Sequence, residues 1–166
     1  MKRILVIGSP GSGKSYFSGK LAEKTDIPVY HLDMLFWNTD RSTVSREIFI
    51  ERLTDVLEKD VWIIDGNYSY TMEMRLEKCD TVFFFDLPVD VCLDGIRERR
   101  GKPRADLPWN EADYEVDSEF IDFVKSFPKE RAPGIYELLK RFSDRQIHIF
   151  KSRAEADGFL ENLQNI

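Results

Sequence analysis

Residues 8–15 of this chain read Gly8-Ser9-Pro10-Gly11-Ser12-Gly13-Lys14-Ser15, and this stretch decides the fold. It has the pattern G-x-x-x-x-G-K-S/T, which needs a strand before it and a helix after it. The apolar run at residues 2–7 and the helical pattern after the loop provide both. The glycines let consecutive main-chain N–H groups turn towards one point, where the following helix adds roughly half a positive charge. The stretch therefore predicts a phosphate-binding loop that holds a nucleoside triphosphate.

Within this loop the residue types assign the roles. We expect the main chain from Gly8 to Tyr16 to surround the phosphates of ATP. Lys14 is expected to reach the β- and γ-phosphates and to take part in catalysis, and the Ser15 hydroxyl is expected to bind Mg²⁺. ATP and Mg²⁺ are therefore the predicted cofactors.

The composition indicates a soluble globular domain. The chain has 166 residues and a net charge of −6, which disfavours general attraction to nucleic acid or to anionic lipid. No apolar run is long enough to span a bilayer, and residues 4–7 are too few for a signal-peptide core. Cys79 and Cys92 have neither metal-ligand spacing nor a CxxC pattern, so they are expected to be reduced thiols. We therefore predict a cytoplasmic protein without membrane or nucleic-acid partners.

Strand and helix patterns alternate along the chain. Apolar runs predict strands at residues 2–7, 28–32, 61–65, 81–86 and 146–150. Helical spacing predicts helices at residues 15–24, 44–57, 88–96, 116–127, 135–142 and 152–163. Ser152 and Glu155 form a capping box for the last helix, and Pro128 and Pro133 are expected to end or kink the helix before them. This alternation predicts an α/β domain in which helices cover both faces of a parallel sheet.

Four stretches resemble a known family. They are His31-Leu32-Asp33-Met34-Leu35-Phe36-Trp37, Trp62-Ile63-Ile64-Asp65-Gly66-Asn67-Tyr68-Ser69, Phe85-Asp86-Leu87-Pro88 and Phe127-Pro128-Lys129-Glu130-Arg131. With the phosphate-binding loop they resemble the bacterial FlaR-like "DNA topology modulation protein" family. More distantly, the chain is similar to adenylate kinase and shikimate kinase, within the nucleoside-monophosphate-kinase-like group.

This resemblance implies a specific architecture. It is a P-loop NTPase three-layer sandwich with a five-stranded parallel sheet of order 2-3-1-4-5. The implied single domain covers residues 1–166, with an acceptor-binding region at about 33–50 and a basic lid after the fourth strand, at about 97–131.

Two aspartates at predicted strand ends are candidate site residues. Asp65 ends the strand that lies beside the phosphate-binding loop in this topology, and it is expected to hold a water molecule of the Mg²⁺ shell. It resembles the aspartate of the Asp-Gly pair in adenylate kinases. Asp33 emerges at the same edge of the sheet. In resembling kinases of small alcohols, an aspartate at this place faces the acceptor hydroxyl and takes its proton. The alternative for both residues is to cap a turn, and His31 is expected to pack or to form a hydrogen bond rather than to catalyse.

The residues that follow the second and third strands are predicted to bind the acceptor. These are Asp33, Trp37, Asn67, Tyr68 and Arg75. For the last four, packing in the core is an equal alternative. Adenylate kinases have arginines near the positions of Trp37 and Asn67, where they hold the phosphate of the acceptor. This departure disfavours a nucleoside monophosphate as acceptor, unless another cation substitutes: Arg41, Arg46 or Arg75.

Five cations are concentrated within eight residues after the fourth strand. They are Arg97, Arg99, Arg100, Lys102 and Arg104. The resemblance implies that this run is part of a lid that closes over ATP, with Arg131 on the returning side. Arginine suits this role because its planar group stacks on a base or binds two phosphate oxygens. Arg97, Arg100, Arg104 and Arg131 are the predicted catalytic contacts; the alternative is a solvated face at a helix C-terminus.

Together these features predict an ATP-dependent phosphotransferase, a P-loop kinase. It would move the γ-phosphoryl group of ATP·Mg to a small-molecule acceptor, which is a nucleotide, a nucleoside or a hydroxylated metabolite, and would act as a monomer or a homodimer. The alternative is an ATP-binding regulatory or nucleic-acid-associated protein with weak ATPase or adenylate-kinase-like activity. Its basic run lacks the interleaved aromatic residues that sequence-tolerant nucleic-acid binding uses. A GTPase-type switch is disfavoured because no Asn-Lys-x-Asp segment precedes the last helices.

Overall fold

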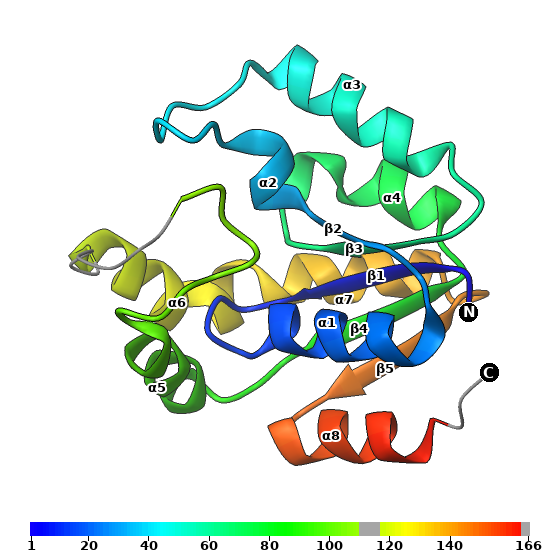
Figure 1. Cartoon of the computed structure of the whole chain (residues 1–166). Coiled ribbons are helices and arrows are strands. Elements are labelled where there is room, and N and C mark those ends of the chain that lie inside the picture. Colours follow the sequence, from blue (N-terminus) through cyan, green and yellow to red (C-terminus); the bar gives the residue numbers. More distant parts are fainter. Residues whose placement is uncertain (110–116, 164–166) are drawn as a thin grey trace.

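A parallel sheet forms the centre of the molecule, whose computed structural model describes residues 1–109 and 117–163. Its strands are β1 (Arg3–Gly8), β2 (Val29–His31), β3 (Trp62–Asp65), β4 (Thr81–Phe85) and β5 (Gln146–Phe150). They lie in the order β2-β3-β1-β4-β5, and every neighbouring pair is parallel (Figure 1). This arrangement confirms the predicted α/β fold and its strand order. Residues 110–116 of the predicted lid, and residues 164–166, lie outside the described residues.

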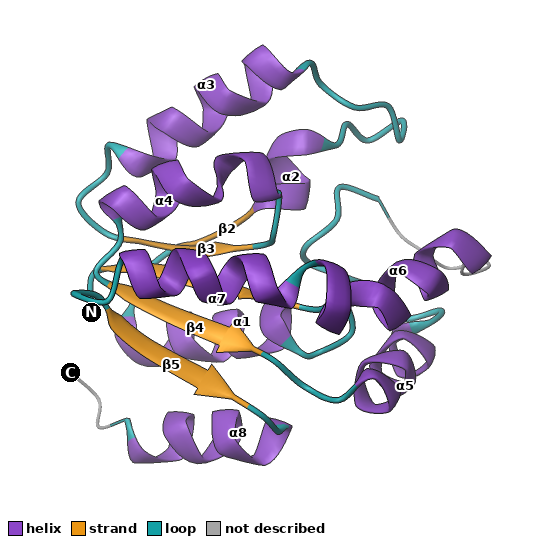
Figure 2. Ribbon diagram, turned by 180° about the vertical axis from the view of Figure 1, so that it is seen from behind, coloured by secondary structure: helices purple, strands orange, loops and turns teal. Residues whose placement is uncertain are grey.

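The helices cover both faces of the sheet. One face carries α1 (Lys14–Thr25), α5 (Val89–Arg99) and α8 (Arg153–Asn162). The other carries α3 (Arg46–Leu57), α4 (Met72–Lys78) and α7 (Ala132–Arg141). Figure 1 shows α1 in front of the sheet with α7 behind it, and Figure 2 shows the reverse view. The remaining helices are α2 (Leu32–Phe36), the short 3-10 helix η1 (Ser69–Thr71) and α6 (Ser118–Glu130). The predicted three-layer sandwich is thereby confirmed.

Alternation along the central strand divides the core into two layers. Ile4 and Val6 of β1 pack with the layer that contains α1, whereas Leu5 and Ile7 pack with the layer that contains α3 and α7. All four side chains are completely buried. Successive side chains of a strand point to opposite faces, so an apolar run without polar interruptions is what a strand covered on both faces requires. None of the helices in the described ranges is long and apolar enough to cross a membrane.

Several predicted boundaries need correction. The second strand ends at His31, and Asp33 lies in the first turn of α2 rather than at a strand end. Pro88 is the N-cap of α5 and not its first helical residue. Pro128 is accommodated inside α6, two residues before the helix ends, where the loss of one N–H donor disturbs little of the helix. The sequence predicted neither η1 nor α4, because seven helical residues are too few to produce a periodic apolar pattern.

Candidate functional site

The phosphate-binding loop (residues 8–15) ends at a helix N-terminus that no side chain of the described residues caps. Gly13 is the N-cap of α1, with a φ of 102°, and a Cβ added there would meet nothing within 4 Å. Gly11 has a φ of 77°, and a Cβ there would lie 2.1 Å from the carbonyl oxygen of Cys92 in α5. The loop is therefore packed tightly on its α5 side and open on the side that the first amides of α1 face. Uncapped amides before an open space are suited to bind phosphate.

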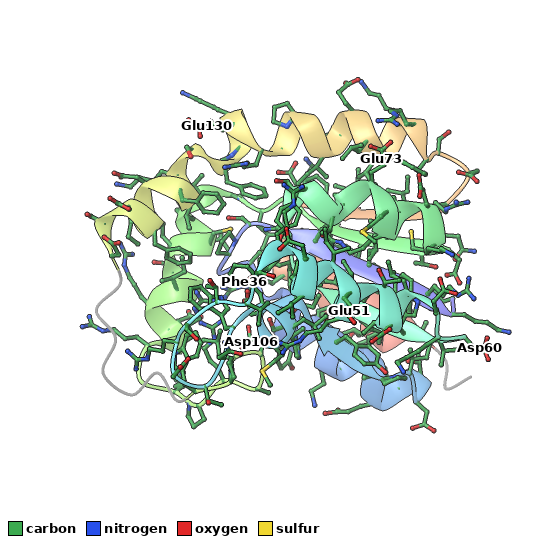
Figure 3. The ribbon with its side chains drawn as sticks, turned by 90° about the horizontal axis from the view of Figure 1, so that it is seen from above. Phe36, Glu51, Asp60, Glu73, Asp106 and Glu130 are labelled. Carbon is green, nitrogen blue, oxygen red and sulfur yellow. The ribbon has the colours of Figure 1, made fainter. Side chains whose placement is uncertain are left out.

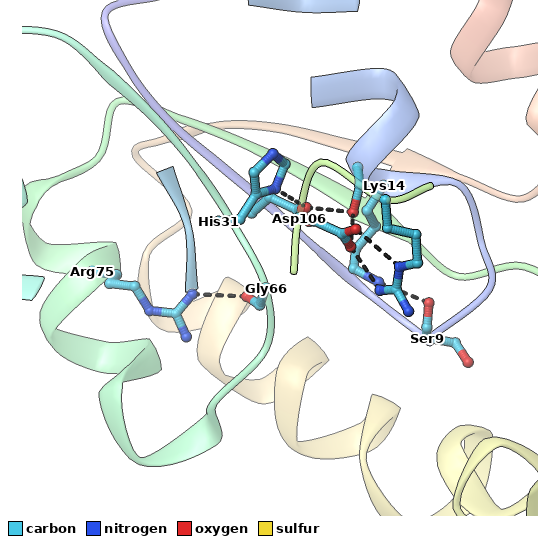
Figure 4. Close-up of polar contacts among 9 residues, drawn as sticks. Ser9, Lys14, His31, Gly66, Arg75 and Asp106 are labelled. Atoms are coloured by element: carbon cyan, nitrogen blue, oxygen red, sulfur yellow. Dashed lines mark hydrogen bonds and ion pairs between the residues drawn. The ribbon is translucent and has the colours of Figure 1, made fainter. Parts of the chain in front are cut away.

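Lys14 lies along the inside of this loop. Its Nζ donates a hydrogen bond of 2.9 Å to the main-chain oxygen of Ser9 (Figure 4). Burial lowers the pKa of Lys14, and the nearby charge of Asp65 opposes that effect. A phosphate group in the loop would stabilise the charged ammonium in the same way.

Ser15 and Asp65, the predicted metal-binding pair, lie in contact. The Ser15 Oγ donates to Asp65 Oδ2 at 2.7 Å, and the Nδ1 of His31 lies 2.9 Å from the same carboxylate oxygen. Asp65 is only 5% exposed, and its Oδ1 has no hydrogen-bond partner among the described residues. His31 thus forms the hydrogen bond expected of it, and burial lowers its pKa less than the bond and charge of Asp65 raise it. A hydroxyl and a buried carboxylate with an unpartnered oxygen fit a hard divalent cation such as Mg²⁺.

Asp106 joins this cluster, although the sequence did not single it out. Its Oδ2 lies 2.9 Å from the Ser15 Oγ, and the guanidinium of Arg104 binds both of its oxygens, at 3.0 and 2.8 Å (Figure 4). Asp106 is 9% exposed, and Figure 3 shows it within the outline of the molecule while Asp60 and Glu130 lie at the rim. Burial alone would raise the pKa of Asp106, but Arg104 and the Ser15 hydroxyl lower it to about 2.

Asp33 lies at a different part of the same cavity. Its Oδ1 accepts a hydrogen bond of 2.7 Å from the hydroxyl of Tyr68, and burial raises the pKa of both groups. Tyr68 has a φ of 39°, in the left-handed region that a residue with a side chain seldom adopts. Tyr68 is in the loop after β3. Its hydroxyl points from this loop towards Asp33. The structure therefore brings two of the predicted acceptor-binding residues together.

An aromatic wall closes this part of the cavity. The ring of Trp37 packs edge to face against the rings of Trp109, at 5.6 Å, and Phe36, at 5.3 Å. The guanidinium of Arg41 lies over the ring of Trp109 at 5.8 Å. Trp109 belongs to the basic loop (residues 100–109), which follows α5. Two tryptophans from segments far apart in the sequence therefore face the same space.

Asn67 and Arg75 were predicted to contact the acceptor, and the structure gives them other partners. The side-chain amide of Asn67 lines the cavity, but it accepts from the N–H of Gly8 at 3.0 Å and donates to the carbonyl of Gly8 at 2.7 Å. Arg75 is completely buried and does not line the cavity. It donates to the carbonyl oxygen of Gly66 at 2.9 Å (Figure 4). It also donates to that of Tyr68 at 3.2 Å and contacts that of Asn67.

The reason for the correction at Arg75 lies in the loop that it supports. Gly66 and Tyr68 have positive φ values of 135° and 39°, and the carbonyls of residues 66–68 turn towards the protein interior. Buried carbonyls need donors, and a guanidinium carries five N–H groups in a rigid plane. Arg75 therefore holds the shape of the loop that positions Asn67 and Tyr68.

The predicted cationic cluster divides into two groups. Its members that line the cavity are Arg99, Arg100, Lys102 and Arg104. Of the four arginines predicted as catalytic contacts, the structure thus brings Arg100 and Arg104 to the phosphate-binding loop. Because these cations line the cavity, they raise the positive potential where a polyphosphate would lie.

Arg97 and Arg131 lie outside the cavity. Arg97 is 74% exposed and pairs with Asp94, one turn earlier in α5, at 2.8 Å. Arg131, between α6 and α7, lies over the ring of Phe123 at 5.5 Å. Helical spacing explains the first result, because Arg97 and the cavity residue Arg99 are two positions apart in α5 and point to nearly opposite sides of the helix.

Arg153 is a further cavity residue that the sequence did not predict. It is the first residue of α8, and its Nη2 donates to the carbonyls of Gly11 at 3.2 Å and Val91 at 3.4 Å. It therefore ties α8 to both the phosphate-binding loop and α5. Ser152 caps this helix as predicted, since its Oγ accepts from the N–H of Glu155 at 3.2 Å, but the Glu155 carboxylate accepts from the N–H of Lys151 at 2.7 Å rather than from that of Ser152. This pattern marks a helix start and not a site.

One cavity of about 1030 Å³ connects these groups. It extends from the phosphate-binding loop, at Pro10 to Tyr16, to the aromatic wall at Trp37 and Trp109. This volume is at the upper end of the range for a cavity that holds one small molecule, so there is room for a nucleotide and a second ligand.

Comparisons with known proteins agree with this architecture. No protein-family model and no curated protein matches the sequence. Among solved structures, a shikimate kinase from Bacteroides thetaiotaomicron is 21% identical with a TM-score of 0.61, covering 96% of this chain and 94% of that one. A shikimate kinase from Acinetobacter baumannii in complex with shikimate is 15% identical with a TM-score of 0.62, covering 97% and 89%. A sugar kinase from Janibacter sp. HTCC2649 is 13% identical with a TM-score of 0.56, covering 97% and 91%. The chain has the fold of these kinases, and its resemblance to the FlaR-like family stays a prediction.

Proposed function

We propose that this protein is an ATP- and Mg²⁺-dependent kinase that phosphorylates a hydroxyl group of a small molecule. The observation that carries the proposal is a single cavity with a phosphate-binding loop at one end and the hydrogen-bonded pair Asp33 and Tyr68 at the other. The named activities of the structural neighbours, shikimate kinase and sugar kinase, agree with a hydroxylated acceptor.

The phosphate end has the groups that phosphoryl transfer requires. The amides at the start of α1 and the ammonium of Lys14 would bind the β- and γ-phosphates. Arg100 and Arg104 approach from the basic loop and would neutralise charge on the transferring group. The Ser15 hydroxyl and the Asp65 carboxylate would hold Mg²⁺, which supplies positive charge that stabilises the phosphates during transfer.

The acceptor end has one carboxylate suited to activate a hydroxyl. The bond from Tyr68 fixes one oxygen of Asp33, which leaves the carboxylate in a defined orientation within the cavity. A hydroxyl placed there would donate its proton to Asp33 as its oxygen forms a bond to the γ-phosphorus of ATP, while the bond from that phosphorus to the β,γ-bridging oxygen breaks and ADP leaves. In this role Asp33 is the catalytic base and Tyr68 positions it.

The charges around the acceptor end favour an uncharged acceptor. The carboxylate of Asp33 lies at the acceptor end, whereas Asp65 and Asp106 lie beside Ser15 at the phosphate end of the same cavity. Of the three cations that were candidates for binding an acceptor anion, Arg46 lies over the ring of Tyr70 at 4.5 Å and Arg75 is buried beneath its loop. The third, Arg41, lines the cavity over the ring of Trp109. A flat, neutral, hydroxylated molecule that packs on the aromatic wall, such as a nucleoside, fits better than a nucleoside monophosphate.

An acceptor screen with matched charges tests this proposal. ADP formation from ATP·Mg is measured with nucleosides, with the corresponding 5′-monophosphates and with neutral sugars. We expect a neutral compound to stimulate ADP formation, and Asp33→Asn to lower its rate by about 10²–10⁴-fold while leaving ADP affinity intact. Lys14→Ala should abolish transfer with the fold retained. Faster transfer to the monophosphates would contradict the acceptor class, and an unchanged rate in both variants would contradict the kinase itself.

The basic run gives little support to a nucleic-acid-binding function. Arg100, Lys102 and Arg104 line the cavity beside the phosphate-binding loop, and Arg104 is paired with Asp106. The shielding of Arg104 withdraws one charge of this run from a nucleic-acid backbone, whereas Arg100 and Lys102 are exposed.

A further inference from the structure

We propose that Asp106 is a third protein ligand of the Mg²⁺ ion, so that metal binding fixes the basic loop and its Arg104 over the nucleotide. This inference rests on the proposed function, and it assigns a role to a residue that the phosphate-loop motif does not include. The basic loop would then be ordered by the metal, and not by the nucleotide alone.

The spacing of three oxygen atoms supports a shared cation. The Ser15 Oγ lies 2.7 Å from Asp65 Oδ2 and 2.9 Å from Asp106 Oδ2. Neighbouring ligands of an octahedral Mg²⁺ ion, with bonds of 2.0–2.1 Å, are about 2.9 Å apart. Both carboxylate oxygens therefore lie about as far from the Ser15 oxygen as neighbouring ligands of one ion would.

The number of hydrogen atoms between Ser15 and the two carboxylates also supports a cation. The Ser15 hydroxyl has one proton, whereas ionised carboxylates of Asp65 and Asp106 only accept. One of the two short contacts therefore lacks a hydrogen atom. A divalent cation between the Ser15 oxygen and the two Oδ2 atoms would satisfy that contact, because it attracts all three oxygens at once. The Oδ1 of Asp65 is also buried without a partner among the described residues.

The rest of the coordination shell would come from the nucleotide and water. Within residues 1–109 and 117–163, no group of three or more His, Cys, Asp or Glu side chains is placed to hold a metal ion. Mg²⁺ commonly binds through one or two carboxylates together with substrate phosphates and water molecules. We therefore expect this site to bind the metal only when a nucleotide is present.

Asp106 links the metal to the catalytic arginine. Arg104 binds both oxygens of Asp106 from only two residues away, and their side chains are equally shielded, each 12% exposed. Because both residues belong to the basic loop, a cation that holds Asp106 also holds the guanidinium of Arg104 near the phosphates. The opposite role for Asp106 is a plug, in which its carboxylate takes the place of a phosphate and repels the nucleotide.

Calorimetry of ADP binding distinguishes these two roles. Affinities are measured with saturating Mg²⁺ and with EDTA, for the wild type, Asp106→Asn and the control Asp94→Asn. Asp94 is a matched control because it also pairs with an arginine, Arg97, but on the exposed side of α5. We expect Asp106→Asn to reduce the Mg²⁺-dependent gain in ADP affinity by about 10-fold or more, with little change in EDTA. Tighter ADP binding in EDTA, with the Mg²⁺ gain intact, would overturn the proposal in favour of a plug.

Trp109 provides a second readout within the same loop. Its ring contacts that of Trp37, so a change in loop position should alter its fluorescence. Mg²⁺ added to the ADP complex should change this emission in the wild type and in Asp94→Asn but not in Asp106→Asn, and Trp109→Phe identifies the signal. An Mg²⁺ response that Asp106→Asn retains would overturn the proposal. Neither readout needs an acceptor; a wild type that binds no ADP would instead contradict the proposed kinase function.

Discussion

The buried guanidinium of Arg75 donates hydrogen bonds to the carbonyl groups of one loop. We therefore predict that Arg75 is important for stability. Arg75→Lys would keep the charge but leave several buried carbonyls without donors, since an ammonium cannot reproduce a planar set of five N–H groups. We expect the free energy of unfolding, measured with urea, to fall by roughly 3–5 kcal/mol.

The matched control for this residue is Arg46→Lys. Arg46 is exposed and lies over the ring of Tyr70, so its replacement should change stability by less than about 1 kcal/mol. A stable Arg75→Lys variant whose only defect is a raised KM for the acceptor would show that Arg75 contacts substrate instead.

At the scale of elements, α5 packs so closely on the phosphate-binding loop that Gly95 has no room for a side chain. A Cβ at this position would lie 2.0 Å from the carbonyl oxygen of Gly11 and 2.5 Å from Nη2 of Arg153. Gly95→Ala should therefore displace the helix, lower the free energy of unfolding by about 1–3 kcal/mol and weaken ADP binding.

Alanine in an open helical position has the opposite effect. Gly19→Ala in α1, where a Cβ meets nothing within 4 Å, should stabilise by roughly 0.5–1 kcal/mol. Equal stabilisation by both substitutions would contradict the close packing of α5.

The sequence predicts best those elements that bury a face over their whole length. The strands β1 and β4, which are buried over almost their whole length, lie within one residue of the predicted bounds. The short α4 and η1 are held by the core and by Arg75 rather than by their own periodicity, so no local pattern announces them. For the same reason, Asp33 was placed at a strand end instead of in α2, a helix of five residues.

At the scale of the whole molecule, the candidate site combines residues that a local pattern predicts with residues that only the fold brings in. Ser15 belongs to the loop motif, and Asp65 follows from the parallel neighbours β1 and β3. Asp106 is 91 residues from Ser15, in a segment without periodicity, and Arg153 is 142 residues from Gly11. Neither position has a sequence signal beyond its residue type, because loop conformation determines where the side chain lies.

Residues that form the site and residues that stabilise the fold lie at opposite ends of the strands. The site lies at the carboxyl ends of the strands, whereas Asp80 joins β1 to β4 at the amino ends. Its carboxylate accepts hydrogen bonds from the main-chain N–H groups of Lys2 at 2.8 Å and Arg3 at 3.0 Å, and from the hydroxyl of Thr81 at 2.6 Å. Burial opposes ionisation, but these bonds outweigh it and lower the pKa of Asp80.

We therefore predict that Asp80 contributes a pH-dependent part of the free energy of unfolding. Nucleotide binding should not depend on Asp80. A carboxyl group whose folded-state pKa is depressed stabilises the fold above its unfolded pKa of about 3.9, and this contribution is lost as pH falls through the folded value. Asp80→Asn should therefore lower the free energy of unfolding at pH 7 by about 1 kcal/mol, because the site is partly exposed to solvent. The difference from the wild type should shrink below about pH 4, as the wild-type carboxylate gains its proton.

The control is Asp60→Asn, a substitution at an exposed position before β3, which should alter neither stability nor ADP affinity. Urea unfolding across this pH range, together with ADP affinity at pH 7, checks the prediction. A stability difference that grows on acidification, or a loss of ADP binding in Asp80→Asn, would contradict this separation of site residues from stabilising residues.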